Sequence, residues 1–158
     1  MVCSSADKRL GFTGLHKKDF REKDNMIIRE YTDYRDEEIL GLYTDAGWVA
    51  YTEEPAKLRE GYKNSLLVLA AYEGEELLGI IRAVGDGSTI VFIQDILVYK
   101  KHQRQGVGTA LLKAVLDRYQ HVRQIELVTD STEKTVAFYR SAGFKTLSEF
   151  GCCGFMRG

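Results

Sequence analysis

The sequence predicts a single mixed α/β (α+β) domain, in which a mostly antiparallel β-sheet is flanked by about four helices. Short apolar runs separated by turn residues over 66–84 indicate an antiparallel hairpin. A strand–helix–strand succession over 89–129 indicates a parallel pair, because parallel strands require a crossover connection. The length of 158 residues suits one domain, and 44% hydrophobic with 28% charged residues is ordinary globular composition.

The N-terminal segment is expected to lie outside this domain. Residues 1–25 mix both charges without sustained helical or strand periodicity, whereas an apolar run begins at Met26. We therefore interpret residues 1–25 as an extension and residues 26–158 as the folded domain.

Periodicity and turn residues define the elements of the domain. Apolar side chains fall on one face of the predicted helices, most clearly after Val107, and Pro55 is a residue favoured in a helix's first turn. Asp130 with Glu133 resembles a capping box, and Gly143 suits a helix end. The predicted elements are a strand over 26–31, a helix over 36–46, a short helix from Pro55, strands over 66–72, 77–84 and 89–99, a helix from Val107, a strand over 124–129, a helix over 132–142, and a hairpin over 144–150 and 152–156.

Charge and cysteine content exclude several classes of protein. A net charge of −1 gives no general attraction to nucleic acid or to anionic membranes. The sequence contains neither an apolar run long enough to span a bilayer nor the apolar stretch of a signal peptide, so we expect a cytoplasmic protein. The cysteines at 3, 152 and 153 are not spaced as zinc ligands, and no metal is expected.

A strand–loop–helix segment over 98–110 carries the clearest chemical signal. The start of an amphipathic helix directs free N–H groups and the positive end of the helix dipole outwards, which favours an anion. Gly106 and Gly108 allow a phosphate to approach the main chain, while Gln103 and Arg104 add side-chain donors. The alternative is a loop whose glycines only permit a tight turn into the helix. Dinucleotide-binding and Walker-type glycine patterns do not match.

The segments 93–98, 103–108 and 137–144 together resemble the GNAT superfamily of acetyl-CoA-dependent N-acetyltransferases. This resemblance implies a sheet whose central parallel pair splays apart to admit acetyl-CoA. It implies a cofactor site made of Ile96, Leu97, Val98, Gln103, Arg104, Gln105, Gly106, Val107, Gly108, Thr109 and Thr132. Many family members have an asparagine after the next strand, where this sequence has Thr129-Asp130-Ser131-Thr132, so a hydroxyl is expected to replace that contact.

The resemblance also suggests catalytic roles. Tyr139 would protonate the departing thiolate, because a phenol with a pKa near ~10 can share a proton with a thiolate of roughly 8–9. The alternative is a core tyrosine beside Phe138. Asp95, a charge inside an apolar strand, is the candidate general base, or else it is hydrogen-bonded at a strand irregularity. The Leu97 N–H is expected to polarise the thioester carbonyl.

An aromatic and acidic region is the candidate acceptor site. Trp48, Tyr51 and Glu53 could frame a cation, although they could equally pack or face solvent. We therefore expect direct acetyl transfer to a primary amine of a small molecule. The alternatives are a non-catalytic acyl-CoA-binding sensor and an enzyme acting on a protein lysine or N-terminus. A C-terminal edge strand could join two subunits into a homodimer.

Overall fold

A computed structural model describes residues 25–157, which form parts of two compact units. Residues 25–128 belong to the first unit and residues 129–157 to the second. The expected extension, residues 1–25, lies outside the described residues except for Asn25.

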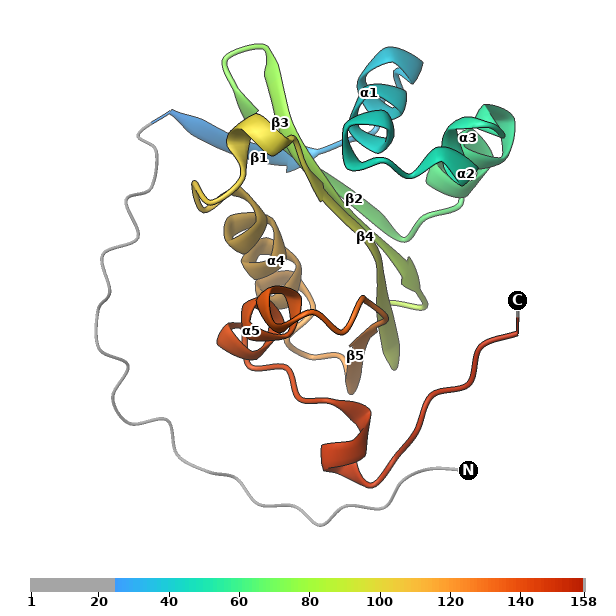
Figure 1. The fold of residues 1–158 in the computed structure, drawn as a ribbon, viewed down its shortest axis with the longest axis vertical. Helices are drawn as coiled ribbons and strands as arrows, with labels where there is room; N and C mark the ends of the chain where they lie inside the picture. The colour runs from blue at the N-terminus through green and yellow to red at the C-terminus, as the bar shows by residue number, and fades with distance from the viewer. Residues whose placement is uncertain (1–24, 158) are drawn as a thin grey trace. The chain divides into compact units, whose positions relative to one another are not determined.

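A five-stranded sheet is the framework of the first unit, with strand order β1-β2-β3-β4-β5 (Figure 1). The strands are β1 (Met26–Glu30), β2 (Leu67–Glu73), β3 (Glu76–Gly85), β4 (Ile90–Val98) and β5 (Gln124–Leu127). Pairing is antiparallel from β1 to β4 and parallel between β4 and β5. The mixed, mostly antiparallel sheet predicted from the sequence is confirmed.

Helices cover both faces of this sheet (Figure 1). They are α1 (Asp36–Ala46), α2 (Val49–Thr52), α3 (Pro55–Lys63), the 3₁₀ turn η1 (Lys100–His102) and α4 (Val107–Arg118). Helix α1 buries Ile39, Leu42 and Tyr43, and α3 buries Leu58 and Tyr62, in one core with side chains of β2, β3 and β4. Helix α4 packs against β3, β4 and β2. The single-turn helix α2 was not predicted.

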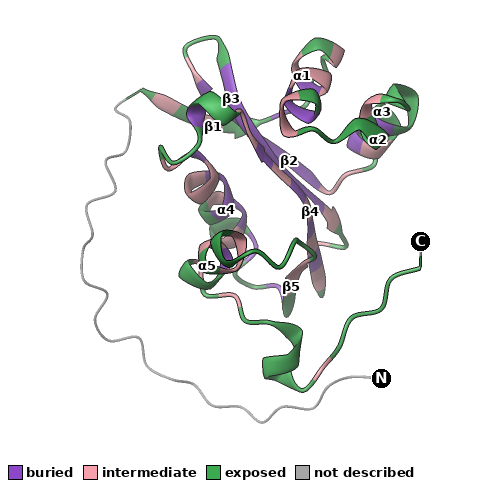
Figure 2. Ribbon diagram, in the orientation of Figure 1, coloured by how far each residue is buried: buried purple, intermediate pink, exposed green. Residues whose placement is uncertain are grey.

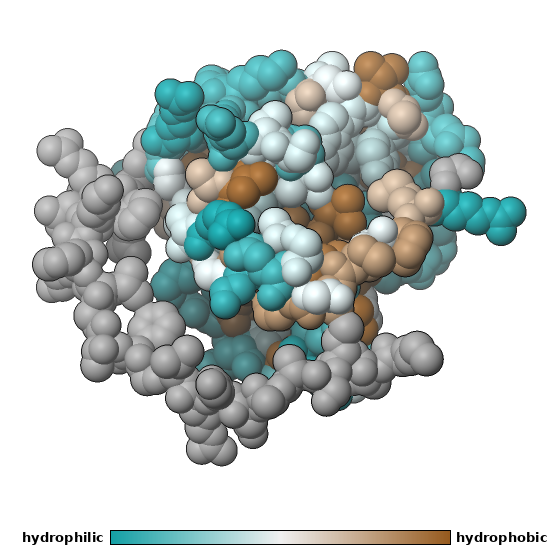
Figure 3. Space-filling view, turned by 60° about the horizontal axis from the view of Figure 1, so that its bottom comes forward, coloured by the Kyte–Doolittle hydropathy of each residue, from teal (hydrophilic) through white to brown (hydrophobic). Residues whose placement is uncertain are grey.

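The most deeply buried residues lie on the central strands and on the inner faces of α1 and α4 (Figure 2). Along β3 the run from Leu77 to Ala83 is buried without interruption, as expected for a strand covered on both faces. Hydrophobic side chains also remain on the surface in places (Figure 3), and Ile27, Val49 and Val128 of the first unit are each more than half exposed.

A β-bulge at Gln94 changes which side chains of β4 point to each face of the sheet. Arg82 pairs with Asp95, but the next residue of β3, Ala83, pairs with Ile93. Cross-strand partners share a face of the sheet, whereas consecutive residues of a strand point to opposite faces. The side chains of Ile93 and Asp95 therefore point to opposite faces, and Asp95 is directed to the face covered by α1 and α3.

The parallel pair is short and leaves part of β4 open. The pairing of β4 with β5 covers Ile90 to Ile93 only, and β5 ends at Leu127. Among the described residues of this unit, the stretch 94–98 has no strand partner on the β5 side. The family resemblance implied a splayed central pair; in the described sheet the parallel pair is β4 with the edge strand β5, and its pairing ends at Ile93.

The second unit contains helix α5 (Glu133–Ser141) and a 3₁₀ turn, η2 (Leu147–Phe150). Thr132, rather than Asp130, is the N-cap of α5: its hydroxyl accepts the Thr135 N–H at 3.3 Å. Asp130 supports the cap by accepting the Thr132 N–H at 2.9 Å.

The C-terminal hairpin predicted over 144–150 and 152–156 is wrong. Thr146 and Glu149 form a capping box that begins η2, and Gly151 ends it at φ 70°. These local hydrogen bonds favour a helical turn over a strand. Residues 152–157 form no regular element, so the edge strand on which the homodimer expectation depended is not present there. Across 25–157, no helix is long and apolar enough to cross a membrane.

Candidate functional site

The loop between β4 and α4 presents a run of free main-chain donors. Arg104 and Gly106 adopt left-handed φ angles of 60° and 84°. The N–H groups from Arg104 to Thr109 have no hydrogen-bond partner among the described residues, and Ala110 is the first to donate into the helix, to the Gly106 carbonyl at 2.9 Å. Consecutive N–H groups in such a turn form a concave anion-binding site.

Helix α4 leaves the positive end of its dipole uncompensated. Its first turn contains no acidic residue, and no side chain caps it. A Cβ added to Gly106 would meet no atom within 4 Å. The glycine is therefore required by its left-handed conformation, which a side chain would strain, rather than by lack of space. A phosphate group fits this site because it supplies the missing negative charge and acceptors.

The glutamines of the loop shape it instead of facing outwards. Gln103 Nε2 donates to the Val98 carbonyl at 3.2 Å, and Gln105 Nε2 donates to the Lys101 carbonyl at 2.9 Å. Of the predicted side-chain donors, only Arg104 has no such bond among the described residues. Most of the donors for an anion are therefore main-chain N–H groups.

Strand register decides which main-chain groups line the open edge of β4. The Tyr99 N–H donates to the Leu78 carbonyl at 3.0 Å, and Leu97 pairs with Ile80 on the same strand β3. Main-chain groups alternate between the two sides of a strand, so those of Leu97 are directed towards β3. The open edge is therefore formed by Ile96 and Val98. This register does not favour the thioester role that the sequence suggested for the Leu97 N–H.

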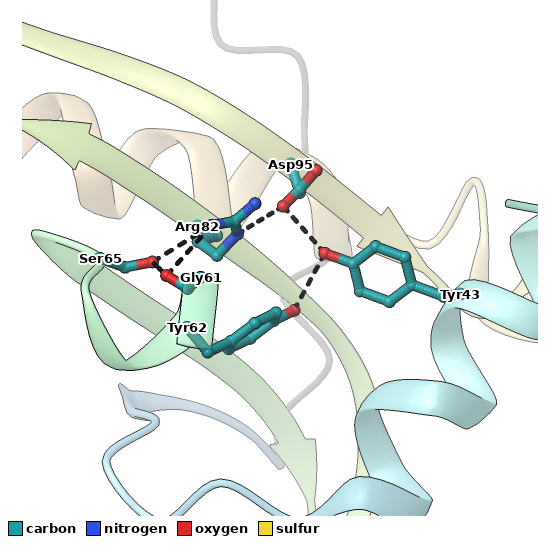
Figure 4. Close-up of polar contacts among 6 residues, drawn as sticks. All are labelled: Tyr43, Gly61, Tyr62, Ser65, Arg82 and Asp95. Atoms are coloured by element: carbon teal, nitrogen blue, oxygen red, sulfur yellow. Dashed lines mark hydrogen bonds and ion pairs between the residues drawn. The ribbon is translucent and has the colours of Figure 1, made fainter. Parts of the chain in front are cut away.

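Asp95 is the centre of a buried polar network (Figure 4). Its Oδ2 atom accepts from Arg82 Nε at 2.5 Å and from the Tyr43 hydroxyl at 2.8 Å. Tyr62 donates to the Tyr43 hydroxyl at 3.4 Å, and Asp95 itself is 2% exposed. The other carboxylate oxygen, Oδ1, is buried without a hydrogen-bond partner among the described residues. It is the only oxygen of Asp95 that could accept a new proton or hydrogen bond.

Electrostatics fix the protonation states of the arginine and the two tyrosines of this network near neutral pH. Burial lowers the pKa of Arg82, but the charge and hydrogen bond of Asp95 outweigh burial and leave the pKa of Arg82 above its usual value. Burial raises the pKa values of Tyr43 and Tyr62 well above that of free tyrosine, with the neighbouring Asp95 carboxylate adding to the effect. The arginine is therefore charged, and both phenols remain neutral hydrogen-bond donors.

A pocket of about 210 Å³ opens next to this network. Its walls come from α2 and α3, and Arg82 reaches it from β3; the lining includes Ala50, Tyr51, Glu54, Lys57, Leu58 and Arg82. Of the predicted acceptor residues, Tyr51 lines the pocket. The Trp48 ring packs against the Tyr51 ring at a centroid distance of 5.8 Å. Glu53 does not line it, whereas its neighbour Glu54 does.

Tyr139 lies in the second unit, on α5. Its ring packs edge-on against Phe138 and Phe144 at centroid distances of 5.0 and 5.8 Å. Burial raises the pKa of Tyr139 to about 12, with a smaller contribution from Asp130. The hydroxyl has no hydrogen-bond partner among the described residues and is not among the side-chain atoms buried without one, so solvent reaches it. Thr132, predicted to contact the cofactor, uses its hydroxyl to cap α5.

Comparisons with known proteins identify the class. A family model described as the acetyltransferase (GNAT) domain matches residues 30–152, most of the chain. The chain therefore belongs to the GNAT acetyltransferase family. A GNAT-family acetyltransferase from Streptococcus pneumoniae TIGR4 is 37% identical with a TM-score of 0.76, over 84% of this chain and 96% of that one. The GNAT fold implies acetyl-CoA as co-substrate.

Two soybean (Glycine max) proteins are also similar. "Probable acetyltransferase TAP2" is 33% identical over 115 residues, and "Histone acetyltransferase TAP1" is 33% identical over 103 residues. These alignments cover 64% and 57% of this chain, and the chain spans 44% of the length of each relative. Among residues 25–157 no group of three or more His, Cys, Asp and Glu could hold a metal ion.

The partners of Asp95 were missed at the sequence level. Arg82 interrupts the apolar strand 77–84 just as Asp95 interrupts the strand 89–99. Opposite charges in neighbouring apolar strands indicate a buried pair, because neither charge is tolerated alone. Tyr43 and Tyr62 carried no comparable signal, because tyrosines on the apolar face of a helix are common.

We predict that Asp95→Asn lowers the free energy of unfolding by roughly 3–5 kcal/mol, because it leaves the Arg82 charge buried without a counter-charge. Urea unfolding followed by circular dichroism measures this loss. The control is Asp117→Asn, which removes an exposed ion pair with Lys113 and should leave the unfolding midpoint unchanged. Equal stability of both variants would contradict a structural role for the buried pair.

Proposed function

We propose that the protein transfers an acetyl group from acetyl-CoA to a primary amine of a small molecule, by direct attack of the amine within a ternary complex. The observation that carries this proposal is the run of unpartnered main-chain N–H groups from Arg104 to Thr109 at the start of α4. These groups supply the donors that the coenzyme A pyrophosphate requires. Family membership supports the same chemistry.

The proposed donor site is built on the β4–α4 segment of the first unit. The turn 103–109 would hold the pyrophosphate, and the open main-chain groups of Ile96 and Val98 would pair with the pantetheine amides as an added strand does. On α5, Tyr139 would donate its phenolic proton to the sulfur as the carbon–sulfur bond breaks. Its free hydroxyl and raised pKa support this role, because the proton is present at neutral pH.

The acceptor amine must be uncharged when its nitrogen attacks the acetyl carbon. Asp95 is our candidate base, acting through Oδ1, the carboxylate oxygen that has no partner within the described chain. Before it loses its proton, the acceptor amine is a cation. In this proposal it is attracted by the ring faces of Trp48 and Tyr51, which are 38% and 36% exposed, and by the carboxylates of Glu53 and Glu54. A pocket of about 210 Å³ suits a small molecule.

Release of free thiol from acetyl-CoA tests the reaction. We expect thiol release with at least one small primary amine, and none with the corresponding tertiary amines, which have no proton to lose after acyl transfer. Calorimetry measures coenzyme A binding in parallel. Binding without turnover on any amine would instead indicate a sensor, and turnover only on lysine peptides would indicate a protein acetyltransferase.

Gly106→Ala should weaken binding of acetyl-CoA about 10-fold or more, because the φ of 84° is strained for alanine and its relaxation displaces the N–H groups. The dissociation constant of coenzyme A measures this. The control is Gly74→Ala, which places the same strain at φ 60° in the β2–β3 turn. Comparable weakening by both variants would show a general loss of folding rather than a binding role.

Tyr139→Phe should lower kcat by at least ~100-fold, while the KM for acetyl-CoA changes little, because the phenol acts only when the thiolate leaves. Tyr119→Phe is a matched control, since Tyr119 is also 8% exposed. Unchanged kcat in Tyr139→Phe would remove this residue from the mechanism.

The pH dependence of kcat provides a second test of Tyr139. A general acid must be protonated, and burial holds the pKa of Tyr139 at about 12, above the ordinary tyrosine value. We therefore expect the acid form to persist, with no decline of kcat through roughly pH 10, where free tyrosine ionises. A decline there that disappears in Tyr139→Phe would contradict this assignment.

A further inference from the structure

The guanidinium of Arg82 has a donor that the network around Asp95 does not use. Its Nε atom donates to Asp95, and Nη1 donates to the Gly61 carbonyl at 3.3 Å and the Ser65 hydroxyl at 3.4 Å. Nη2 has no partner within residues 25–157 and is not among the atoms buried without one, so solvent reaches it. Figure 4 shows this free nitrogen beside the bonded ones.

Three side-chain contacts hold this donor in one place. Arg82 as a whole is 7% exposed, and its guanidinium also lies over the Tyr62 ring at 5.2 Å from the centroid. A guanidinium is planar, so fixing Nε and Nη1 also fixes the direction of the two N–H bonds on Nη2. Because Arg82 lines the pocket under α2 and α3, this preorganised donor is available to a molecule bound there.

The charges around the pocket favour an uncharged partner for Nη2. Asp95 already neutralises Arg82 at 2.5 Å, and on the rim Glu54 pairs with Lys57 at 2.5 Å. A carboxylate at Nη2 would be a second negative charge beside a compensated arginine, and its desolvation would not be offset. A carbonyl oxygen accepts the same hydrogen bond without adding charge. The remaining walls, including Ala50 and Leu58, are apolar.

We propose that Arg82 is a specificity-determining residue that donates from Nη2 to an uncharged carbonyl oxygen on the non-reacting end of the acceptor amine. The inference rests on the proposed acetyl transfer and specifies its substrate class: amines that carry a carboxamide or similar carbonyl group. The location is suitable, because Arg82 pairs across the strands with Asp95, which is adjacent to Ile96 on the proposed donor edge.

Three amines of matched shape test the proposal: 3-aminopropanamide, β-alanine and isopentylamine, together with their homologues one methylene longer. Their affinities are measured by the emission of Trp48, the single tryptophan of the chain, which packs against the pocket residue Tyr51. Thiol release from acetyl-CoA is measured separately. We expect the carboxamide to bind at least ~10-fold more tightly than the other two, since a hydrogen bond from a charged donor discriminates by about this factor.

Two variants locate the preference. Arg82→Lys retains a positive charge opposite Asp95 but has no Nη2, and should reduce the preference for the carboxamide to below ~3-fold if it arises from this donor. Ala50→Phe fills the pocket mouth without touching the ion pair, and should weaken all three amines. Val49→Phe is its control, because Val49 is a 58% exposed neighbour on α2 that does not line the pocket. Thermal unfolding checks that each variant folds. If Arg82→Lys does not fold, the comparison of Ala50→Phe with Val49→Phe still tests whether the amines bind in this pocket.

The outcomes separate this inference from the proposed reaction. Equal binding of the three amines, stronger binding of β-alanine, or a carboxamide preference that survives in Arg82→Lys would overturn the role of Arg82. If Ala50→Phe binds the amines as tightly as Val49→Phe does, the pocket is excluded as their binding site. A carboxamide preference in binding without thiol release would support the binding role of Arg82 and count against acetyl transfer to these amines. Thiol release without any preference would support acetyl transfer and overturn the role of Arg82.

Discussion

The buried ion pair between Arg82 and Asp95 is the constraint on which the candidate acceptor site depends. Burying two charges is costly, and the structure offsets this with further hydrogen bonds: Tyr43 donates to the carboxylate, and the guanidinium donates to Gly61 and Ser65. These partners come from α1, α3 and the segment after α3. The pair therefore links the helices that form the pocket to the strands β3 and β4, and the position of each depends on the others.

The bulge at Gln94 places this pair and the donor edge on the same strand. If Gln94 paired regularly with β3 instead of forming the bulge, Asp95 would share a face with Ile93 and point towards α4, where the strands present apolar side chains. The bulge also changes which residues of β4 direct their main-chain N–H and C=O groups away from β3. After the bulge these are Ile96 and Val98, and their groups lie on the side where β5 has ended. The bulge thus directs the Asp95 side chain to the face covered by α1 and α3 and leaves the main-chain groups of Ile96 and Val98 without a strand partner among the described residues.

Local patterns made the sheet, α1, α4 and the anion-binding turn predictable from the sequence. The turn follows from glycines placed at a helix start, and it requires no knowledge of distant residues. The C-terminal hairpin was mispredicted because apolar residues around 144–156 outweighed the capping signal of Thr146 and Glu149. The partners of Asp95 could not be read locally, since Tyr43 is 52 residues away in sequence and only the folded sheet brings them to 2.8 Å.

The two halves of the proposed site therefore respond differently to sequence change. Donors in the turn are main-chain N–H groups, so substitutions that preserve the left-handed conformation at Gly106 retain them whatever the side chains are. The acceptor side consists of side chains from three helices and two strands, and each replacement alters shape or charge directly. We therefore expect substitutions in α2 and α3 to alter the proposed acceptor side while the proposed donor turn stays intact. The position of Arg82 limits this freedom, because changing it disturbs both the pocket and the ion pair that holds the strands in register.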